Sequence, residues 1–255
     1  KKGGAVLLDL QWSADSQKLI LQTAFNEQGR YFLLDLQKKP VSPASLGYLG
    51  VFEKIDFNKS DAGKFFLLKD GRLLSGEFAL KTTSPLAENV LAFEYADNRL
   101  YFLDQAGLIF RQDNLADEGS RQKVIDEPLE IQAETGYELR LINSKLFLQN
   151  GEKLSWLNED TRSFEEIAPS VQNFKASTDR EKLVYFNSSE IWVFFLQDIN
   201  GQPARKKGEK ILLARFSEKI GDVFWINDDY IVFNAGDVIR SLEIDDRDQP
   251  NLAEL

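Results

Sequence analysis

The chain of 255 residues contains no cysteine, no histidine and no methionine. Without cysteine it has no disulfide, no thiolate nucleophile and no cysteine-ligated zinc or iron–sulfur site. Without histidine it lacks the usual general base and the commonest transition-metal ligand, so no Ser-His-Asp or Cys-His triad can be built from this chain alone. The missing cysteine does not fix the compartment, because disulfide-free proteins occur on both sides of membranes.

Basic residues are fewer than acidic ones, with 31 Lys and Arg against 41 Asp and Glu and a formal net charge of −10. A surface that binds nucleic acid needs clustered Lys and Arg. The densest basic run is Arg205-Lys206-Lys207, and it stands among Gly201, Pro203 and Gly208, which favours a solvated loop. We therefore expect no nucleic-acid partner.

Apolar runs long enough to span a membrane are also missing. The strongest run, Ile191–Leu196, has the length of a buried strand, so we expect no direct membrane insertion by this segment.

The chain begins Lys-Lys-Gly-Gly, without an initiator methionine or a signal-peptide pattern. We expect it to be a processed product or a part of a longer protein.

One unit of sequence recurs six times. Strong apolar strands open at Lys18, Lys64, Arg99, Lys145, Lys182 and Asp229, at intervals of 46, 35, 46, 37 and 47 residues. The mean interval of about 42 residues is the size of a four-stranded propeller blade. The recurrence therefore indicates duplication of one supersecondary unit.

The flanks of these strands repeat as well. An extended run such as LDLQWS, EKIDFN or LAFEYA precedes each strand, and a polar turn separates the two. A second turn, a third strand and a weaker, more polar fourth strand follow; Asp70-Gly71 and Asn150-Gly151 predict primed hairpin turns. The runs are four to seven residues long and rich in aromatic and aliphatic residues, which excludes substantial helices.

These patterns predict an all-β fold, a β-propeller of six four-stranded antiparallel blades packed face to face around an axis. A seventh blade is expected if one lies outside this sequence. Residues 1–255 are expected to form a single domain, with Ala5–Leu10 as an innermost strand and Asn251–Leu255 as an outermost one. The 19 Phe and 4 Trp residues are expected to fill the space between blades.

The stretch Trp12–Leu21, WSADSQKLIL, resembles the repeat of TolB-like and WD40-like (PD40-type) propellers, whose copies run Trp-Ser-Pro-Asp-Gly. Trp12, Ser13 and Asp15 match, whereas Ala14 and Ser16 replace the family's Pro and Gly. The ending VIRSLEIDDRDQPNLAEL is similar to the last repeat of propellers that accompany PEGA domains in bacterial surface proteins. The resemblance implies a non-catalytic propeller that is extracytoplasmic or on the cell surface, attached to an upstream anchor.

Two acidic segments are candidates for metal sites. Asp198-Ile199-Asn200-Gly201 begins like a calcium loop whose twelfth position is Glu209, but the intervening oxygen ligands are missing, so a hairpin turn is the better interpretation. Asp245-Asp246-Arg247-Asp248 clusters three carboxylates next to Pro250, where a solvated turn is expected. No sialidase-type turn and no glycine-rich phosphate loop is present, so we assign no catalytic, cofactor-binding or metal residue.

The sequence thus favours a non-catalytic scaffolding or interaction module with a protein partner, forming part of a larger bacterial envelope or surface protein. Its working surface is expected at the loops after the first and third strands, or at the mouth of the central channel. The Asp198–Glu209 segment is the first candidate. The alternatives are an accessory propeller of a hydrolase or peptidase, and a small-ligand sensor that uses the channel.

Overall fold

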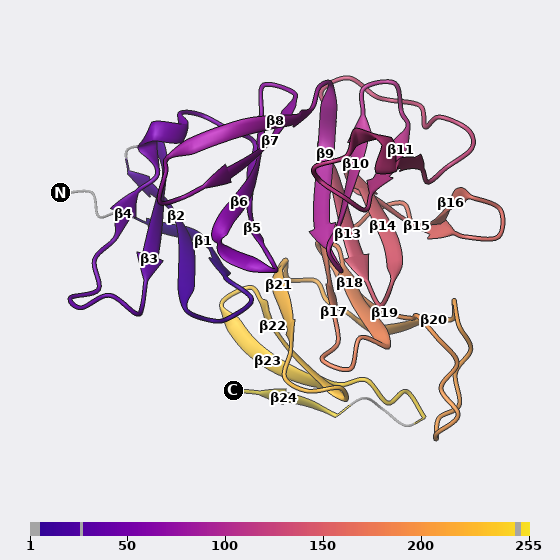
Figure 1. Ribbon diagram of the computed structural model, residues 1–255. Coiled ribbons are helices and arrows are strands. Elements are labelled where there is room, and N and C mark those ends of the chain that lie inside the picture. The colour runs from indigo at the N-terminus through magenta and orange to yellow at the C-terminus, as the bar shows by residue number, and fades with distance from the viewer. Residues whose placement is uncertain (1–5, 26–27, 248–250) are drawn as a thin grey trace. The chain divides into compact units, whose positions relative to one another are not determined.

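The computed structural model describes residues 6–25, 28–247 and 251–255, and it builds six sheets of four strands each (Figure 1). The first three sheets are blade 1 with β1 (Val6–Trp12), β2 (Lys18–Phe25), β3 (Gln28–Asp35) and β4 (Ala44–Ser45); blade 2 with β5 (Lys54–Asn58), β6 (Asp61–Lys69), β7 (Arg72–Glu77) and β8 (Thr82–Ala87); and blade 3 with β9 (Val90–Ala96), β10 (Arg99–Asp104), β11 (Ile109–Gln112) and β12 (Arg121–Lys123).

The other three sheets are blade 4 with β13 (Tyr137–Ile142), β14 (Lys145–Asn150), β15 (Lys153–Asn158) and β16 (Ser163–Ala168); blade 5 with β17 (Asn173–Ala176), β18 (Lys182–Phe186), β19 (Glu190–Phe195) and β20 (Lys210–Arg215); and blade 6 with β21 (Ile220–Trp225), β22 (Tyr230–Ala235), β23 (Val238–Glu243) and β24 (Leu252–Glu254). Within the described residues, the helices are the short 3₁₀ turns η1 (Gly47–Leu49) and η2 (Glu118–Ser120), and no helix is long and apolar enough to cross a membrane.

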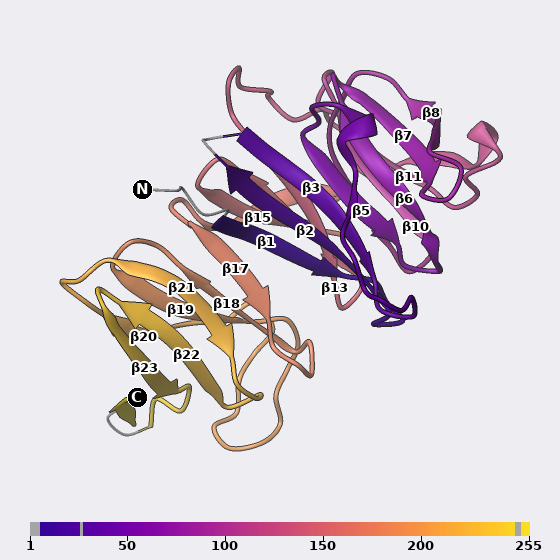
Figure 2. The same cartoon turned by 90° about the vertical axis from the view of Figure 1, so that its left-hand side faces the viewer.

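Every sheet takes its four strands from consecutive stretches of chain, joined as an antiparallel meander (Figure 2). This confirms the predicted all-β fold with six four-stranded antiparallel blades. Of the predicted terminal strands, 251–255 contains β24, whereas Ala5 lies outside the described residues.

By its contacts the chain divides into two compact units, residues 1–139 with blades 1 to 3 and residues 140–255 with most of blade 4 and all of blades 5 and 6. A single domain over 1–255 stays a prediction.

The turns have the predicted chemistry. Asp70 and Gly71 join β6 to β7 with φ angles of 51° and 70°, the positive pair that a type I′ turn requires. The polar turn between the first two strands recurs in detail: the Ser13 hydroxyl donates to Asp15 and to the Lys18 carbonyl, and the Ser177 hydroxyl makes the equivalent bonds in blade 5. The same type of turn, stabilised by a serine side chain, therefore occurs in both blades.

Neighbouring blades pack through both faces of their second strands. In β6, Phe65 and Leu67 enter the cluster shared with blade 1, while the alternate residues Phe66 and Leu68 enter the cluster shared with blade 3. The rings of Phe66 and Tyr95 lie 4.5 Å apart between centroids. A strand that is covered on both sides reads as a continuous apolar run, which explains the sequence KFFLL.

The second unit repeats this arrangement. In β18, Leu183 and Tyr185 pack towards blade 4, and Val184 and Phe186 pack towards blade 6. The expected role of aromatic residues between blades is thus confirmed at these positions in both units. Each fully buried aromatic or aliphatic side chain contributes about 1.5–3 kcal/mol relative to an exposed one.

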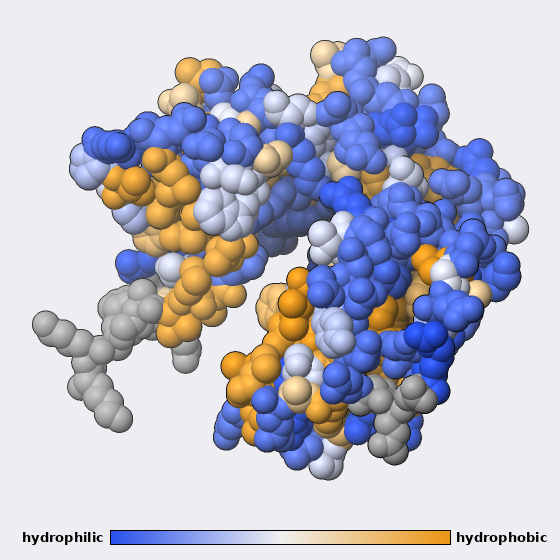
Figure 3. Space-filling model, turned by 90° about the horizontal axis from the view of Figure 1, so that it is seen from below, coloured by the Kyte–Doolittle hydropathy of each residue, from blue (hydrophilic) through white to orange (hydrophobic). Residues whose placement is uncertain are grey.

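Blade 1 carries a large apolar surface on the face turned away from blade 2. Ile20 is buried against blade 2, whereas Leu10 and Trp12 on the opposite face of the sheet are 47% and 51% exposed. Apolar side chains gather on this face, coloured orange in Figure 3. Within the first unit, one sheet face is therefore left uncovered.

We predict that Gly107→Ala lowers the free energy of unfolding by about 3 kcal/mol or more. Gly107 has a φ of 82°, and a Cβ there would lie 2.1 Å from the Leu129 carbonyl oxygen, which belongs to the backbone and cannot move aside. In the control Gly71→Ala, with φ of 70°, the Cβ meets only a Gln105 side chain at 3.5 Å, so about 1 kcal/mol is expected. Urea unfolding of both variants checks this, and equal losses would contradict it.

Candidate functional site

The candidate site lies at the end of the blades where the first strand turns into the second and the third into the fourth. Because the strands alternate in direction, these two turns share one end of each blade. In the second unit this end carries the 196–209 connection between β19 and β20, the 226–229 turn between β21 and β22, and residues 244–247, which follow β23. We call residues 198–209, 226–229 and 244–247 the loop surface.

The 198–209 segment is a small hairpin with its own backbone ladder. Ile199 and Arg205 exchange two backbone hydrogen bonds of 2.9 and 3.0 Å. At the base, the Gly208 amide donates to the Phe195 carbonyl at 2.8 Å, and Gly208 has a φ of 84°. The hairpin geometry agrees with the turn that the sequence predicts, and it gives the segment a defined shape.

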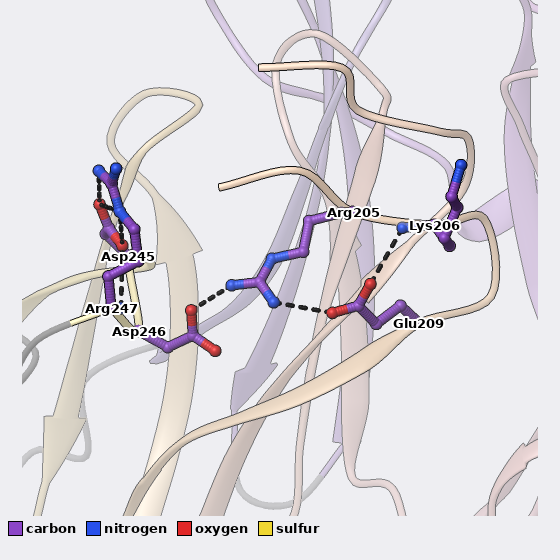
Figure 4. A network of polar contacts seen from close by, with 6 residues as sticks. All are labelled: Arg205, Lys206, Glu209, Asp245, Asp246 and Arg247. Atoms are coloured by element: carbon purple, nitrogen blue, oxygen red, sulfur yellow. Dashed lines mark hydrogen bonds and ion pairs between the residues drawn. The ribbon is translucent and has the colours of Figure 1, made fainter. Parts of the chain in front are cut away.

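Arg205 anchors the hairpin to blade 6. Its guanidinium donates to Glu209 at 2.7 Å and forms an ion pair with Asp246 (Figure 4). The Lys206 amide donates to the other carboxylate oxygen of Glu209 at 3.0 Å, and these two bonds hold the pKa of Glu209 below its ordinary value. The Arg205 side chain is only 12% exposed, so the expectation that the whole basic run is solvated is wrong at this residue.

The two acidic segments are engaged by basic groups of the same surface. Asp198 accepts from the Lys207 amide at 2.9 Å and from the Lys206 ammonium at 3.1 Å. Hydrogen bonds from Arg247 lower the pKa of Asp245 to about 2. Asp248 lies outside the described residues, among which no group of three side chains is placed to hold a metal ion.

A cavity of about 310 Å³ opens beside the hairpin, between it and blade 6. Its apolar walls come from Phe195, Ile199, Pro203 and Ile244, and its polar lining includes Lys182, Arg205, Asp229, Tyr230, Glu243 and Asp245. Lys182 is buried and paired with Asp179 at 2.7 Å, and the nearby charge of Glu243 raises the pKa of Tyr230. An apolar recess with a charged lining suits a side chain or short peptide segment.

A second polar cluster lies on the innermost strands of the first unit. The Lys54 ammonium donates to the Phe93 carbonyl at 2.9 Å and lies 4.0 Å from Asp56 and 3.8 Å from Glu94, which pairs with Lys59 at 2.9 Å. Gln11 of β1 donates to Asp56. Burial raises the pKa of both carboxyl groups in spite of the lysines. The cluster ties the first strands of three blades together, and the pattern of apolar strands gave no signal for it.

Comparison with solved structures places the chain in the β-propeller fold. It is similar to YCF48 from Cyanidioschyzon merolae (9% identity, 98% of this chain and 85% of that one, TM-score 0.62) and to virginiamycin B lyase from Staphylococcus aureus (10% identity, 98% and 84%, TM-score 0.60). It is also similar to Hsv2 from Kluyveromyces lactis (12% identity, 99% and 98%, TM-score 0.57). No protein-family model and no curated protein matches the chain.

These likenesses show the fold alone, because the sequence identities are so low. The general expectation of a propeller is confirmed. The narrower TolB-like type and the association with PEGA domains stay predictions.

We predict that Arg205→Met speeds hydrogen exchange of the hairpin amides about tenfold or more, because charge-assisted hydrogen bonds to Glu209 and Asp246 are lost. The midpoint of thermal unfolding should fall by less than about 4 °C, since the blade cores are untouched. The matched control is Arg215→Met, which removes an exposed guanidinium paired with Glu190. Unchanged exchange at 199–209 in Arg205→Met would show that the ladder alone holds the hairpin.

We predict that the Asp56→Asn variant is less destabilised, relative to the unchanged protein, at neutral pH than at acidic pH. A carboxyl with a raised folded-state pKa contributes stability below its unfolded pKa and loses it as pH rises through the folded pKa. Asparagine does not ionise, so the deficit in unfolding free energy should shrink between about pH 4 and about pH 7. Urea titrations at both pH values measure it; a deficit that grows with pH would contradict the assignment.

Proposed function

We propose that this propeller is a non-catalytic interaction module that binds a segment of a partner protein at the loop surface of its second unit. The observation that carries the proposal is the cavity of about 310 Å³ beside a hairpin with a fixed shape. A recess whose walls are already ordered binds a peptide without the entropic cost of ordering a loop. The net charge of −10 favours a protein partner over nucleic acid.

The wider setting that we propose is a larger bacterial envelope or surface protein, with the propeller outside the cytoplasm. Support for this comes from the Trp12–Leu21 repeat and from the C-terminal stretch that is similar to PEGA-associated propellers. The turn bonds shared by Ser13 and Ser177 agree with a repeat of that type, because they stabilise the same position in two blades.

We predict that Gly201→Trp weakens peptide binding at least about tenfold while leaving the fold intact. Gly201 lines the cavity, and a Cβ there meets only the Ile199 Cγ2 atom at 3.9 Å, so the indole can enter the recess without backbone strain. The measurement is selection from a random displayed peptide library, followed by titration of the enriched peptides. We expect a Kd below about 100 µM for the unchanged protein and at least a tenfold loss in Gly201→Trp.

Gly29→Trp in β3 of the first unit is the matched control, because a Cβ at Gly29 meets nothing within 4 Å. It should bind the same peptides as the unchanged protein. Failure to enrich any peptide, or equal binding by Gly201→Trp, would refute the proposed site.

A further inference from the structure

A pair of lysines shares one tryptophan ring on the opposite flank of the hairpin from the cavity. Trp156 belongs to β15 of blade 4, Lys145 begins β14 of the same blade, and Lys207 comes from the hairpin of blade 5. The Lys145 and Lys207 ammonium nitrogens lie 5.9 and 5.3 Å from the centroid of the Trp156 ring. The ring itself packs edge-on against Phe194 at 5.1 Å. Two cations and an aromatic face are therefore brought together from two blades.

The two ammonium groups have no acidic partner at contact distance. Among the described residues, no carboxylate lies within 4 Å of either one, whereas the adjacent Lys206 pairs with Asp198 at 3.1 Å. Burial and, next, the charge of Lys207 lower the pKa of Lys145, and Glu159 offsets this only in part. Like charges held close together repel each other. In a chain with 41 acidic residues this lysine pair is compensated only in part, and an incoming anion would reduce the remaining repulsion.

The pair is held in place by the fold. The Lys207 amide donates to Asp198 at 2.9 Å, and the next amide, of Gly208, donates to Phe195 at 2.8 Å. Lys145 follows a tight turn in which Asn143 and Ser144 have φ angles of 49° and 58°. Both backbones are therefore positioned before any ligand arrives, which lowers the entropic cost of binding.

We propose that Lys145, Lys207 and Trp156 bind a carboxylate side chain of an acidic peptide segment in the partner protein. This inference rests on the proposed function, since it names the chemistry of the partner that the loop surface takes. A carboxylate bridges the two ammonium groups, and the methylene stem of a glutamate or aspartate lies against the indole. A nucleic acid or an anionic membrane presents an extended array of charges and is repelled by a chain of net charge −10, whereas the few carboxylates of a short peptide feel mainly the local lysines.

The test is calorimetric titration of the full chain with blocked hexaglutamate and hexaglutamine peptides at about 50 mM salt, where surface charges are weakly screened. We expect hexaglutamate to bind at least about tenfold more tightly than hexaglutamine. Lys145→Met and Lys207→Met should each weaken hexaglutamate binding about five- to tenfold. The matched control is Lys153→Met on β15, whose ammonium is already paired with Glu166 at 3.0 Å, and it should stay within about twofold.

Equal binding of the two peptides, or an equal loss in Lys153→Met, would overturn the proposal. Tighter binding of single-stranded DNA or of anionic vesicles through the same two lysines would overturn the assignment to an acidic peptide. If library peptides bind and Gly201→Trp blocks them while hexaglutamate shows no preference, the proposed function stands and this inference fails. If no library peptide binds but hexaglutamate does so through the lysine pair, the cavity proposal alone fails.

Discussion

Burial of both faces of the second strand in blades that have a neighbour on either side, as in β6 and β18, is the constraint on which the rest of the structure depends. In β6 and β18 every second side chain enters one interblade cluster, and the side chains between them enter the next. A single four-stranded sheet of this composition would leave both apolar faces in water. The blades therefore have to stack, and stacking holds their connecting turns on a rigid base. That base is what allows a segment such as the 198–209 hairpin to keep one shape at the surface.

The strands and turns could be predicted because their signals are local. A run such as Leu183–Phe186 is apolar at every position, which marks a strand covered on both sides, and the structure buries all four residues. Asp70-Gly71 favours a turn with two positive φ angles, whatever the rest of the chain does. The period of about 42 residues supplies the blade size without any knowledge of contacts. These features need only neighbours in sequence, and each of them is present in the structure.

The site could not be predicted in the same way, because its contacts join residues far apart in the chain. The sequence around Arg205 predicts a solvated basic run, yet its partner Asp246 stands 41 positions later and in another blade. Asp56 and Glu94 each stand between apolar neighbours in a strand, a pattern that favours a charged side chain facing water. Because these strands are the first of their blades, the structure buries both carboxyl groups. Partner choice across blades depends on register and on the lengths of connections, and neither leaves a periodic signal in the sequence.

What separates scaffold from binding surface in this propeller is whether its charges are compensated internally. Arg205, Asp198 and Asp245 all have partners within the loop surface, so their charges are compensated there and define its shape. Lys145 and Lys207 lie at the same end of the blades, but beside them the fold provides an indole ring and only partial charge compensation, from Glu159 at Lys145 and from Asp198 at Lys207. An aromatic face compensates an ammonium group only in part, by roughly 0.5–1 kcal/mol at an exposed site. The remaining repulsion between the two ammonium groups persists in the unbound protein, and a bound carboxylate is the group that we propose reduces it. The most informative residues of the surface are therefore the ones that the fold leaves without an opposite charge at contact distance.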